Sequence, residues 1–335
     1  MSRSRKMKLF IVFCTGILIT IGILIIVLFR NPTFGAGNRD SDGQKHYVAV
    51  IAKSTTSAFW KSVFAGAKAA STEYNLEITC DGPESEEDYE TQNAMVEKAV
   101  ADGAEVIVFS AVDFNANAAA IDWAIAQGVN VVVIDSEVNS SGVSCVISTD
   151  NYAAGRMAGE AALESDDKAL YVGIVNFDEN SANGQQREQG FRDAIMGESR
   201  VTVIDSINVL SNVEDAMEGT RIMLEQHPQI DVIATFNEWT SLGVGYTIEE
   251  MGLGDSTKVI AFDSNVVSVG LLETGEVDAL IVQNPYAMGY LGIENAYNVI
   301  NDIFIREKVI DTATTIVTKE NMYDPDYQKI LFSFD

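Results

Sequence analysis

A regular alternation of short apolar runs with amphipathic segments is the feature that most restricts how this chain of 335 residues can fold. The runs are rich in Val and Ile, as in YVAVIA at 47–52 and VNVVVI at 129–134, and Gly, Asp or Asn bounds each one. Continuous apolar runs of this length are typical of parallel strands that are buried on both faces. The intervening segments carry apolar residues at three-to-four spacing, which predicts helices. The sequence therefore predicts an α/β fold with parallel sheets.

The alternation occurs twice, which predicts two lobes. The first series ends with the strand CVIS at 145–148, and the second ends with a strand that reaches Gln283. A further helix and a last strand, TTIVT at 314–318, follow. Helices are expected at about 58–74, 86–102, 115–127, 151–164, 185–197, 212–226, 239–251 and 286–304. Two successive series of similar size favour two doubly wound lobes, packed with their strand ends facing a shared cleft, over a single barrel.

The N-terminus carries a strong topological signal. Residues 1–8 are basic, and Leu9–Phe29 is an uncharged run of 21 residues. A helix rises about 1.5 Å per residue, so this run is long enough to cross a bilayer core of about 30 Å. Positive charge stays on the cytoplasmic side. We therefore predict a cytoplasmic tail at 1–8, an uncleaved transmembrane anchor at 9–29, a flexible linker at 30–45, and a single-pass protein whose domain lies outside the cell.

The net charge argues against one class of partner. The formal charge is −27, although the first 30 residues contain five basic residues and no acidic ones. A surface this acidic repels phosphate backbones, so nucleic acid is not expected to bind.

Enzymatic chemistry is poorly represented in the sequence. There is no G-x-G-x-x-G after a strand and no G-x-x-x-x-G-K-[ST], so no nucleotide cofactor is expected. His46 and His227 are the only histidines, and neither has Cys or His partners at metal-ligand spacing. Asp135 and Asp263 resemble a glycosidase carboxylate pair, but a sugar-binding protein positions carboxylates in the same way. We predict a binding protein without cofactor or metal, rather than an enzyme.

Polar side chains and one aromatic pair follow the ends of the expected strands, where open parallel sheets bind ligands. These residues are Ser54–Trp60, Asp113, Asp135, 176–183, Asn237, Glu238, Asp263 and Gln283, together with Arg187 near a helix start. Carboxylates accept hydrogen bonds and Arg donates them, so such a set can bond neighbouring hydroxyls. The rings of Phe59 and Trp60 can cover the C–H faces of a sugar. The pattern predicts a neutral, hydroxyl-rich ligand, although each Asp can instead cap a helix and Arg187 can instead pair with a surface acid such as Glu188 or Asp178.

Several motifs together resemble a known family. The motifs are TTSAFW at 55–60, VVVIDS at 131–136, STDNYAAGRMAG at 148–159, NGQQREQGF at 183–191, TFNEW at 235–239, VIAFDS at 259–264 and ALIVQNP at 279–285. From about 46 to 318, the chain is similar to the type I periplasmic sugar-binding proteins, above all those that resemble ribose-binding protein. The resemblance implies a periplasmic-binding-protein type I fold and ligand-binding roles for Ser57, Phe59, Trp60, Asp135, Ser136, Arg187, Asn237, Asp263 and Gln283.

Three departures from the ribose-binding pattern leave the ligand open. Ser136 stands where ribose binders carry Arg, Ser57 stands where the family often has a bonding Asn, and no second-lobe aromatic residue occurs near Leu210–Ser211. These changes remove donor and stacking groups. A pentose such as xylose, another monosaccharide, a polyol and a furanosyl signal molecule all remain possible ligands.

The resemblance also implies a mechanism and partners. Three chain crossings would form a hinge, with lobe one at 46–149 and 284–313, and lobe two at 150–283 and 314–320. Residues 321–335 would then be a C-terminal strap or a partner-docking segment. Closure of the lobes on a sugar would be read by an ABC importer or, given a similarity to membrane-anchored sugar sensors, by a sensor histidine kinase.

Overall fold

The structure is a computed structural model that describes residues 45–165 and 167–331. The predicted tail, anchor and linker up to residue 44, and the last four residues of the predicted strap, lie outside the described residues. Within the described ranges, no helix combines the length and apolar character needed to cross a membrane. All elements below belong to the compact unit that begins at His46.

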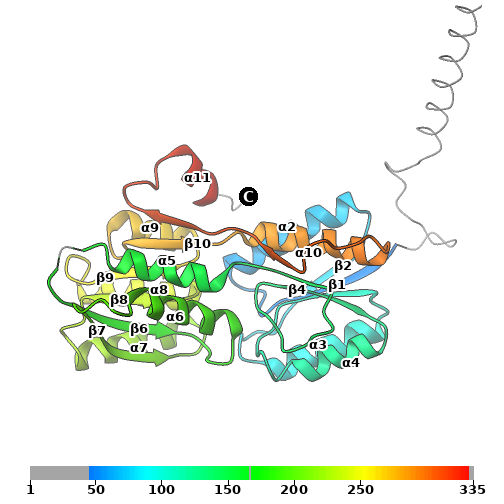
Figure 1. Cartoon of the computed structure of the whole chain (residues 1–335), viewed down its shortest axis with the longest axis horizontal. Helices are drawn as coiled ribbons and strands as arrows, with labels where there is room; N and C mark the ends of the chain where they lie inside the picture. The colour runs from blue at the N-terminus through cyan, green and yellow to red at the C-terminus, as the bar shows by residue number, and fades with distance from the viewer. Residues whose placement is uncertain (1–44, 166, 332–335) are drawn as a thin grey trace, which may run out of the picture. The chain divides into compact units, whose positions relative to one another are not determined.

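The first lobe is built on a parallel sheet of six strands (Figure 1). Its spatial order is β11 (Val309–Asp311), β5 (Cys145–Ser148), β4 (Asn130–Ile134), β3 (Val106–Phe109), β1 (Tyr47–Ile51) and β2 (Glu77–Asp81). One face packs against α2 (Ala58–Glu73) and α10 (Pro285–Ile300), and the other against α3 (Tyr89–Ala101) and α4 (Ala118–Ala126). Alternate strand residues therefore enter two separate cores, which explains the continuous apolar runs of the sequence.

The second lobe repeats this plan. Its sheet has the order β12 (Thr315–Thr318), β10 (Ala279–Val282), β9 (Lys258–Phe262), β8 (Val232–Thr235), β6 (Leu170–Asn176) and β7 (Val201–Asn208). Helices α5 (Asn151–Ala162) and α6 (Ala182–Ile195) cover one face. Helices α7 (Val213–Gln226), α8 (Glu238–Met251) and α9 (Val266–Thr274) cover the other. The α/β prediction of two lobes, each with its own sheet, is confirmed.

The chain passes between the two sheets at three places. It leaves the first sheet after β5, returns to it after β10, and crosses again between β11 and β12. The residue boundaries that the sequence suggested for the two lobes stay a prediction. One strand departs from the expected parallel arrangement, because β12 runs antiparallel to β10.

Some local expectations were wrong. Helix α3 begins at Tyr89 rather than at the expected residue 86, and its N-cap is Asp88, whose side chain accepts from the backbone N–H of Thr91 at 2.9 Å. The short elements β11 and α11 (Pro325–Leu331) were not expected as a strand and a helix. Three residues at a sheet edge and seven in a helix are too few to show a periodic apolar pattern.

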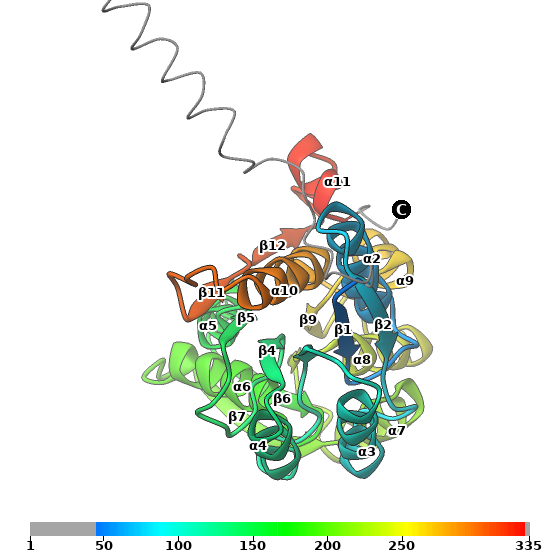
Figure 2. The same cartoon turned by 90° about the vertical axis from the view of Figure 1, so that its right-hand side faces the viewer.

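Close helix contacts hold the elements that carry the expected site. Helices α2 and α10 lie side by side (Figure 2), and a Cβ atom at Gly289 of α10 would lie 1.9 Å from the carbonyl oxygen of Val63 in α2. Helices α5 and α6 meet in the same way, where a Cβ atom at Gly155 would lie 2.0 Å from the carbonyl oxygen of Arg187. Only glycine permits backbones to approach this closely.

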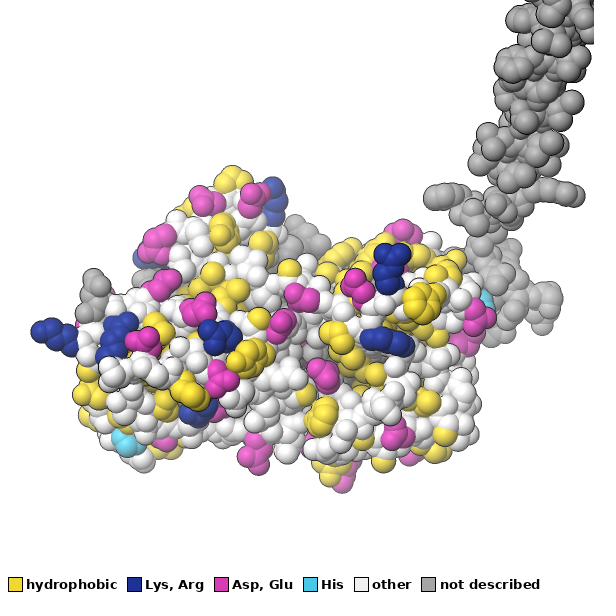
Figure 3. Space-filling model, viewed as in Figure 1, with side chains coloured by type: hydrophobic (Ala, Val, Ile, Leu, Met, Phe, Trp, Pro, Cys, Tyr) yellow, Lys and Arg dark blue, Asp and Glu magenta, His cyan; other side chains and the backbone are white. Residues whose placement is uncertain are grey.

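The surface agrees with the charge of the sequence. Carboxylate side chains are spread over the visible face of both lobes (Figure 3). This face offers no continuous basic area on which a phosphate backbone would bind.

Candidate functional site

A cavity of about 330 Å³, part of it open to solvent, lies between the two lobes. It is lined by Lys53, Ser57, Phe59, Trp60, Glu86, Asp135, Phe177, Asn183, Arg187, Asn237, Glu238, Trp239, Asp263 and Gln283. The structure thus brings eight of the nine residues expected from the sequence to one cavity, all except Ser136. Their roles in ligand binding stay a prediction. Within the described ranges, no group of three His, Cys, Asp or Glu side chains is arranged to hold a metal ion.

The aromatic pair enters the cavity from the first turn of α2. Ser57 is the N-cap, and its hydroxyl oxygen accepts from the backbone N–H of Trp60 at 3.1 Å. The Phe59 and Trp60 rings meet edge to face, with centroids 5.1 Å apart. Trp60 is only 2% exposed, and its indole N–H donates to Glu86 Oε1 at 2.8 Å. Trp60 therefore both packs in the core of the first lobe and forms a rigid wall of the cavity.

Asp135 and Asp263 occupy corresponding positions just after β4 and β9, and both have a left-handed backbone, with φ of 56° and 68°. Asp135 accepts from Ser110 Oγ at 3.0 Å and from Asn183 Nδ2 at 3.2 Å. Neither residue caps a helix. No helix lies between β4 and β5 for Asp135 to cap, and the N-cap of α9, the helix after Asp263, is Asn265. The alternative of a purely capping role is therefore excluded for Asp263. Asp tolerates this backbone better than most residues, and the turn directs the carboxylate to the cavity wall.

Burial dominates the electrostatics of both carboxylates. It raises the pKa of Asp263 to about 7, and the nearby charges of Glu238 and Asp135 act in the same direction. The Arg187 charge and the hydrogen bond from Gln283 oppose this rise. Burial also raises the pKa of Asp135, against the opposing charges of Lys53 and Arg187. A charged carboxylate loses hydration in such a site, so a ligand that donates hydroxyl groups to it replaces the missing water.

Arg187 lies on α6 and is 1% exposed. Its Nε donates to Asn151 Oδ1 at 2.8 Å, and its Nη1 donates to the carbonyl oxygen of Phe236 at 2.7 Å. Its guanidinium also lies 5.0 Å from the centroid of the Phe262 ring. The expected alternative of a surface ion pair is wrong, since Glu188 pairs with Arg192 instead.

Gln283 connects the hinge to both charged groups. Its Oε1 accepts from Thr149 Oγ1 at 2.8 Å and from Arg187 Nη2 at 2.7 Å. Its Nε2 donates to Asp263 Oδ1 at 2.7 Å. These contacts determine which end of the amide faces Asp263, so the side chain is oriented before any ligand enters.

Asn237 has two roles in the structure. It caps α8 through a capping box, in which its side-chain oxygen accepts from the backbone N–H of Thr240 at 2.9 Å. Its Nδ2 also donates to Ser211 Oγ at 2.7 Å, and the residue lines the cavity. Helix capping and a place at the site are therefore compatible.

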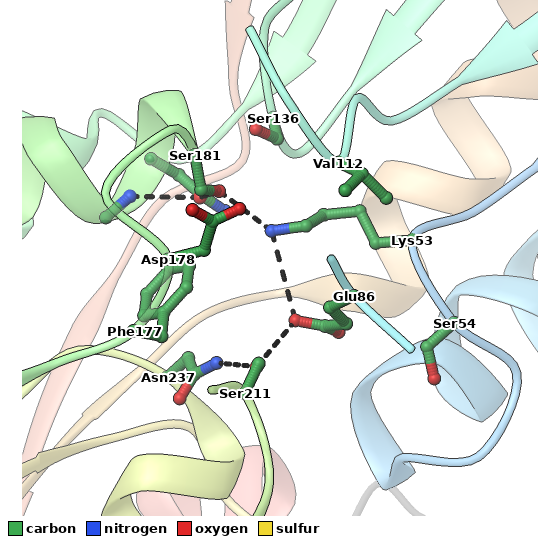
Figure 4. Close-up of polar contacts among 12 residues, drawn as sticks. Lys53, Ser54, Glu86, Val112, Ser136, Phe177, Asp178, Ser181, Ser211 and Asn237 are labelled. Atoms are coloured by element: carbon green, nitrogen blue, oxygen red, sulfur yellow. Dashed lines mark hydrogen bonds and ion pairs between the residues drawn. The ribbon is translucent and has the colours of Figure 1, made fainter. Parts of the chain in front are cut away.

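Sequence reasoning missed Lys53 and Glu86. Lys53 is 2% exposed, and its Nζ donates across the cleft to Ser181 Oγ at 2.8 Å (Figure 4). The same nitrogen lies 3.9 Å from Glu86 Oε2 and 5.0 Å from the centroid of the Phe177 ring. Lys53 stands two residues after the end of β1, so the strand-end rule was sufficient to find it. Glu86 was not recognised as a site residue because the expected helix began at residue 86 and therefore included it.

Ser136 does not line the cavity, and its role in ligand binding stays a prediction. It is fully buried, its backbone N–H donates to Ser110 Oγ at 3.3 Å, and its hydroxyl group has no hydrogen-bond partner among the described residues. Consecutive residues direct their side chains to different sides, and here Asp135 takes the side of the cavity.

Two α/β lobes, a cleft between them and a buried set of polar and aromatic groups define a two-lobed binding protein. A family model described as a periplasmic binding protein domain matches residues 48–302, and the chain belongs to this family. The family predicted from the sequence is thereby confirmed, and the chain is a binding protein, not an enzyme.

Known relatives agree in sequence and in structure. The D-ribose/D-allose-binding protein of Pseudomonas aeruginosa is 24% identical over 286 residues, which cover 82% of this chain and 89% of that protein. A carbohydrate transporter solute-binding protein of Agrobacterium radiobacter, solved with D-arabinose, is 29% identical with a TM-score of 0.83, and the match covers 86% of this chain and 99% of that one. An ABC transporter solute-binding protein of Agrobacterium vitis, solved with D-fucose, is 28% identical with a TM-score of 0.82. The match covers 85% of this chain and 100% of that one.

Proposed function

We propose that the cleft binds one neutral monosaccharide, a pentose such as xylose or a similar sugar. The observation that carries this proposal is a cavity lined by aromatic rings and carboxylates from both lobes, together with amide groups and one guanidinium. Aromatic faces cover the C–H side of a sugar ring, while ionic and amide groups bond its hydroxyls. Relatives that bind D-ribose, D-allose, D-arabinose or D-fucose support the same ligand class.

A polar pair at one end of the cavity bears on the kind of ligand that it accepts. Glu86 and Ser211, which bond each other at 2.9 Å, stand near the place where the resemblance led us to expect a second-lobe aromatic residue. A polar pair at this place favours a ligand with a hydroxyl group over one with an apolar face.

Binding is proposed to act through hinge closure. Polar contacts in the structure join the lobes directly, as between Lys53 and Ser181 and between Asp135 and Asn183. A sugar that bonds groups of both lobes has more contacts in the closed arrangement than in an open one, and this difference in affinity shifts the population toward closure. We propose that the two lobes have the residue boundaries expected from the sequence, and that the three chain crossings between them act as the hinge.

The proposed setting is the outer side of the membrane, with residues 9–29 as the anchor and an ABC importer or a sensor histidine kinase as the partner. Extraction of cell membranes with alkaline carbonate tests the anchor, because a spanning helix stays in the pellet. A permease or a kinase gene next to this gene distinguishes import from sensing.

The experiment that tests the proposed ligand is isothermal titration of the full-length protein in detergent with D-ribose, D-allose, D-arabinose, D-fucose and D-xylose. We expect saturable binding of at least one of these sugars with a stoichiometry of one. Absence of binding for all five would contradict the proposal.

A further inference from the structure

The side of the cleft opposite the hinge is built by two loops, one from each lobe. The three chain crossings involve β5, β10, β11 and β12, which lie toward one edge of the two sheets. Strands β2 and β7 form the opposite edges and run parallel to their neighbours. Ligands bind outside the carboxyl ends of such strands, so the loops at 82–88 and 209–212, which follow β2 and β7, lie at the cleft. A contact between them joins the lobes on the side remote from the hinge.

Two consecutive carboxylates of the first loop hold one serine of the second. Ser211 Oγ donates to Glu86 Oε2 at 2.9 Å, and the backbone N–H of Ser211 donates to Glu87 Oε1 at 2.5 Å. Figure 4 shows the Glu86 side chain directed across the cleft to Ser211. Hydrogen bonds to an ionised acceptor are roughly twice as strong as those between neutral groups. Both donor groups of Ser211 are therefore bound by the other lobe through the stronger kind of hydrogen bond.

The two carboxylates differ in their relation to the cavity. Glu86 is 8% exposed and lines the cavity, where it also accepts from the indole N–H of Trp60. Glu87 is half-buried and is not among the residues that line the cavity. Within the loop, the Ser85 hydroxyl donates to the Glu87 carboxylate, and Ser85 Oγ accepts from the Glu87 backbone N–H at 3.3 Å. The loop itself therefore orients Glu87, and the second lobe supplies its other partner.

Ser211 connects Glu87 to the cavity. Its Oγ accepts from Asn237 Nδ2 at 2.7 Å, and Asn237 lines the cavity and caps α8. The Ser211 hydroxyl group therefore joins an amide of the second lobe to the Glu86 carboxylate of the first, while Glu87 holds the Ser211 backbone. A change at Glu87 reaches two residues of the cavity although Glu87 itself does not line it.

We propose that Glu87 is a positioning residue that keeps the cleft closed over a bound sugar. The inference rests on the proposed function, because it places a sugar in the cleft. Glu87 acts through Ser211, whose contacts with Glu86 and Glu87 exist only while the lobes meet. A sugar leaves through an opened cleft, so loss of one of these contacts speeds its release. A sugar enters the open arrangement, in which the contact is absent, so the rate of entry stays the same.

Stopped-flow fluorescence of the full-length protein in detergent tests this role. Trp60 and Trp239 line the cavity, so their emission reports binding. The probe is the sugar of the five-member panel that binds most tightly. At low sugar concentrations, the observed rate gives the association rate constant as its slope and the dissociation rate constant as its intercept. We expect Glu87→Ala to raise the dissociation rate constant about tenfold, which corresponds to about 1.4 kcal/mol, and to leave the association rate constant nearly unchanged.

Two control variants separate the hydrogen bond from a general effect of charge. Glu87→Gln keeps an oxygen that accepts from the Ser211 backbone N–H, so we expect its dissociation rate constant to be closer to that of the wild type than to that of Glu87→Ala. Glu84→Ala removes the same charge from an exposed position of the same loop and should leave both rate constants unchanged. An unchanged dissociation rate constant in Glu87→Ala, or an equal increase in Glu84→Ala, overturns the positioning role. Absence of binding for every sugar of the panel in the wild type overturns the proposed function instead.

Discussion

At the scale of single residues, Asp263 shows how the cleft alters a common side chain. Burial raises its pKa to about 7, although Arg187 and Gln283 stabilise the charged form. Sugar hydroxyl groups donate hydrogen bonds to an ionised carboxylate. A protonated carboxyl group accepts fewer hydrogen bonds, and its own proton needs an acceptor. The protonation state of one buried group is therefore expected to control affinity near neutral pH.

We predict that sugar affinity falls as the pH decreases from 8 to 5.5. Above pH 7, Asp263 is mostly ionised and the affinity stays level. Below pH 7, the free protein must lose a proton before it binds, so the affinity decreases by up to about tenfold per pH unit. Titration calorimetry over this range measures the slope of affinity against pH. Asp263→Asn is the control, because it removes the titrating group and should abolish the slope. An affinity independent of pH in the wild type would contradict this role.

Arg187 carries a second prediction at this scale. Substitution Arg187→Ala removes the guanidinium donor to the Phe236 carbonyl oxygen, one of the two donors to the Gln283 amide oxygen, and a cation near Asp263. Buried groups left unpaired cost about 1–3 kcal/mol each, so we expect a loss of at least 2 kcal/mol in binding free energy. Arg192→Ala on the same helix removes a partly exposed ion pair and serves as the control. Unchanged calorimetric affinity in Arg187→Ala would show that the site is elsewhere.

At the scale of elements, helix packing determines where the site residues stand. A Cβ atom at Gly155 of α5 would lie 2.0 Å from the carbonyl oxygen of Arg187 on α6. A contact this short forces the helices apart, and Arg187 moves with α6. The position of the guanidinium therefore depends on a glycine that lies outside the cavity.

We predict that Gly155→Ala lowers the free energy of unfolding by about 1–3 kcal/mol, the range for an overpacked interior, and also weakens sugar binding. Gly270→Ala in α9 is the matched control, since a Cβ atom there meets no atom within 4 Å. That change should stabilise the helix by about 0.5–1 kcal/mol and leave binding intact. Chemical denaturation and calorimetry measure both quantities. Equal behaviour of the two variants would exclude the packing explanation.

At the scale of the whole domain, one carboxylate joins the lobes without any ligand. Glu238, at the start of α8 in the second lobe, accepts from the backbone N–H groups of Ala58 at 3.2 Å and Phe59 at 3.0 Å in the first lobe. Asn265 Nδ2 donates to the same carboxylate at 3.0 Å. A negative charge at the N-terminus of α2 is stabilising, so this contact favours the closed arrangement.

We predict that Glu238→Ala shifts the unliganded protein toward an open arrangement and weakens sugar binding, because closure then depends on the ligand alone. Small-angle scattering of the full-length protein in detergent should show a larger radius of gyration without sugar and an approach to the wild-type value at saturation. Glu249→Ala, at an exposed position on the same helix, is the control. Identical scattering of Glu238→Ala and wild type without sugar would argue against the contact as a closure device.

Much of the fold and most of the site follow from local patterns. Continuous apolar runs predicted the strands of both sheets except β11, and the rule that ligands bind at strand ends led to Asp135, Asp263 and Gln283. The family resemblance added Ser136, which does not line the cavity, because the direction of a side chain after a strand depends on the turn that follows. The strand-end rule missed Glu86, because a misplaced helix start put this residue in a helix.

The sequence by itself determined the alternation of strands and helices, the two lobes and the residues at the strand ends, because these depend on periodicity and on neighbours in the chain. Only the tertiary structure decided which distant groups meet. Glu238 contacts Ala58, 180 positions away, and burial among such partners sets the pKa of Asp263. It also decided that α11 lies beside the cleft, since seven residues carry too little pattern to specify where they pack. Contacts between remote segments arise from packing in three dimensions, which no local pattern encodes.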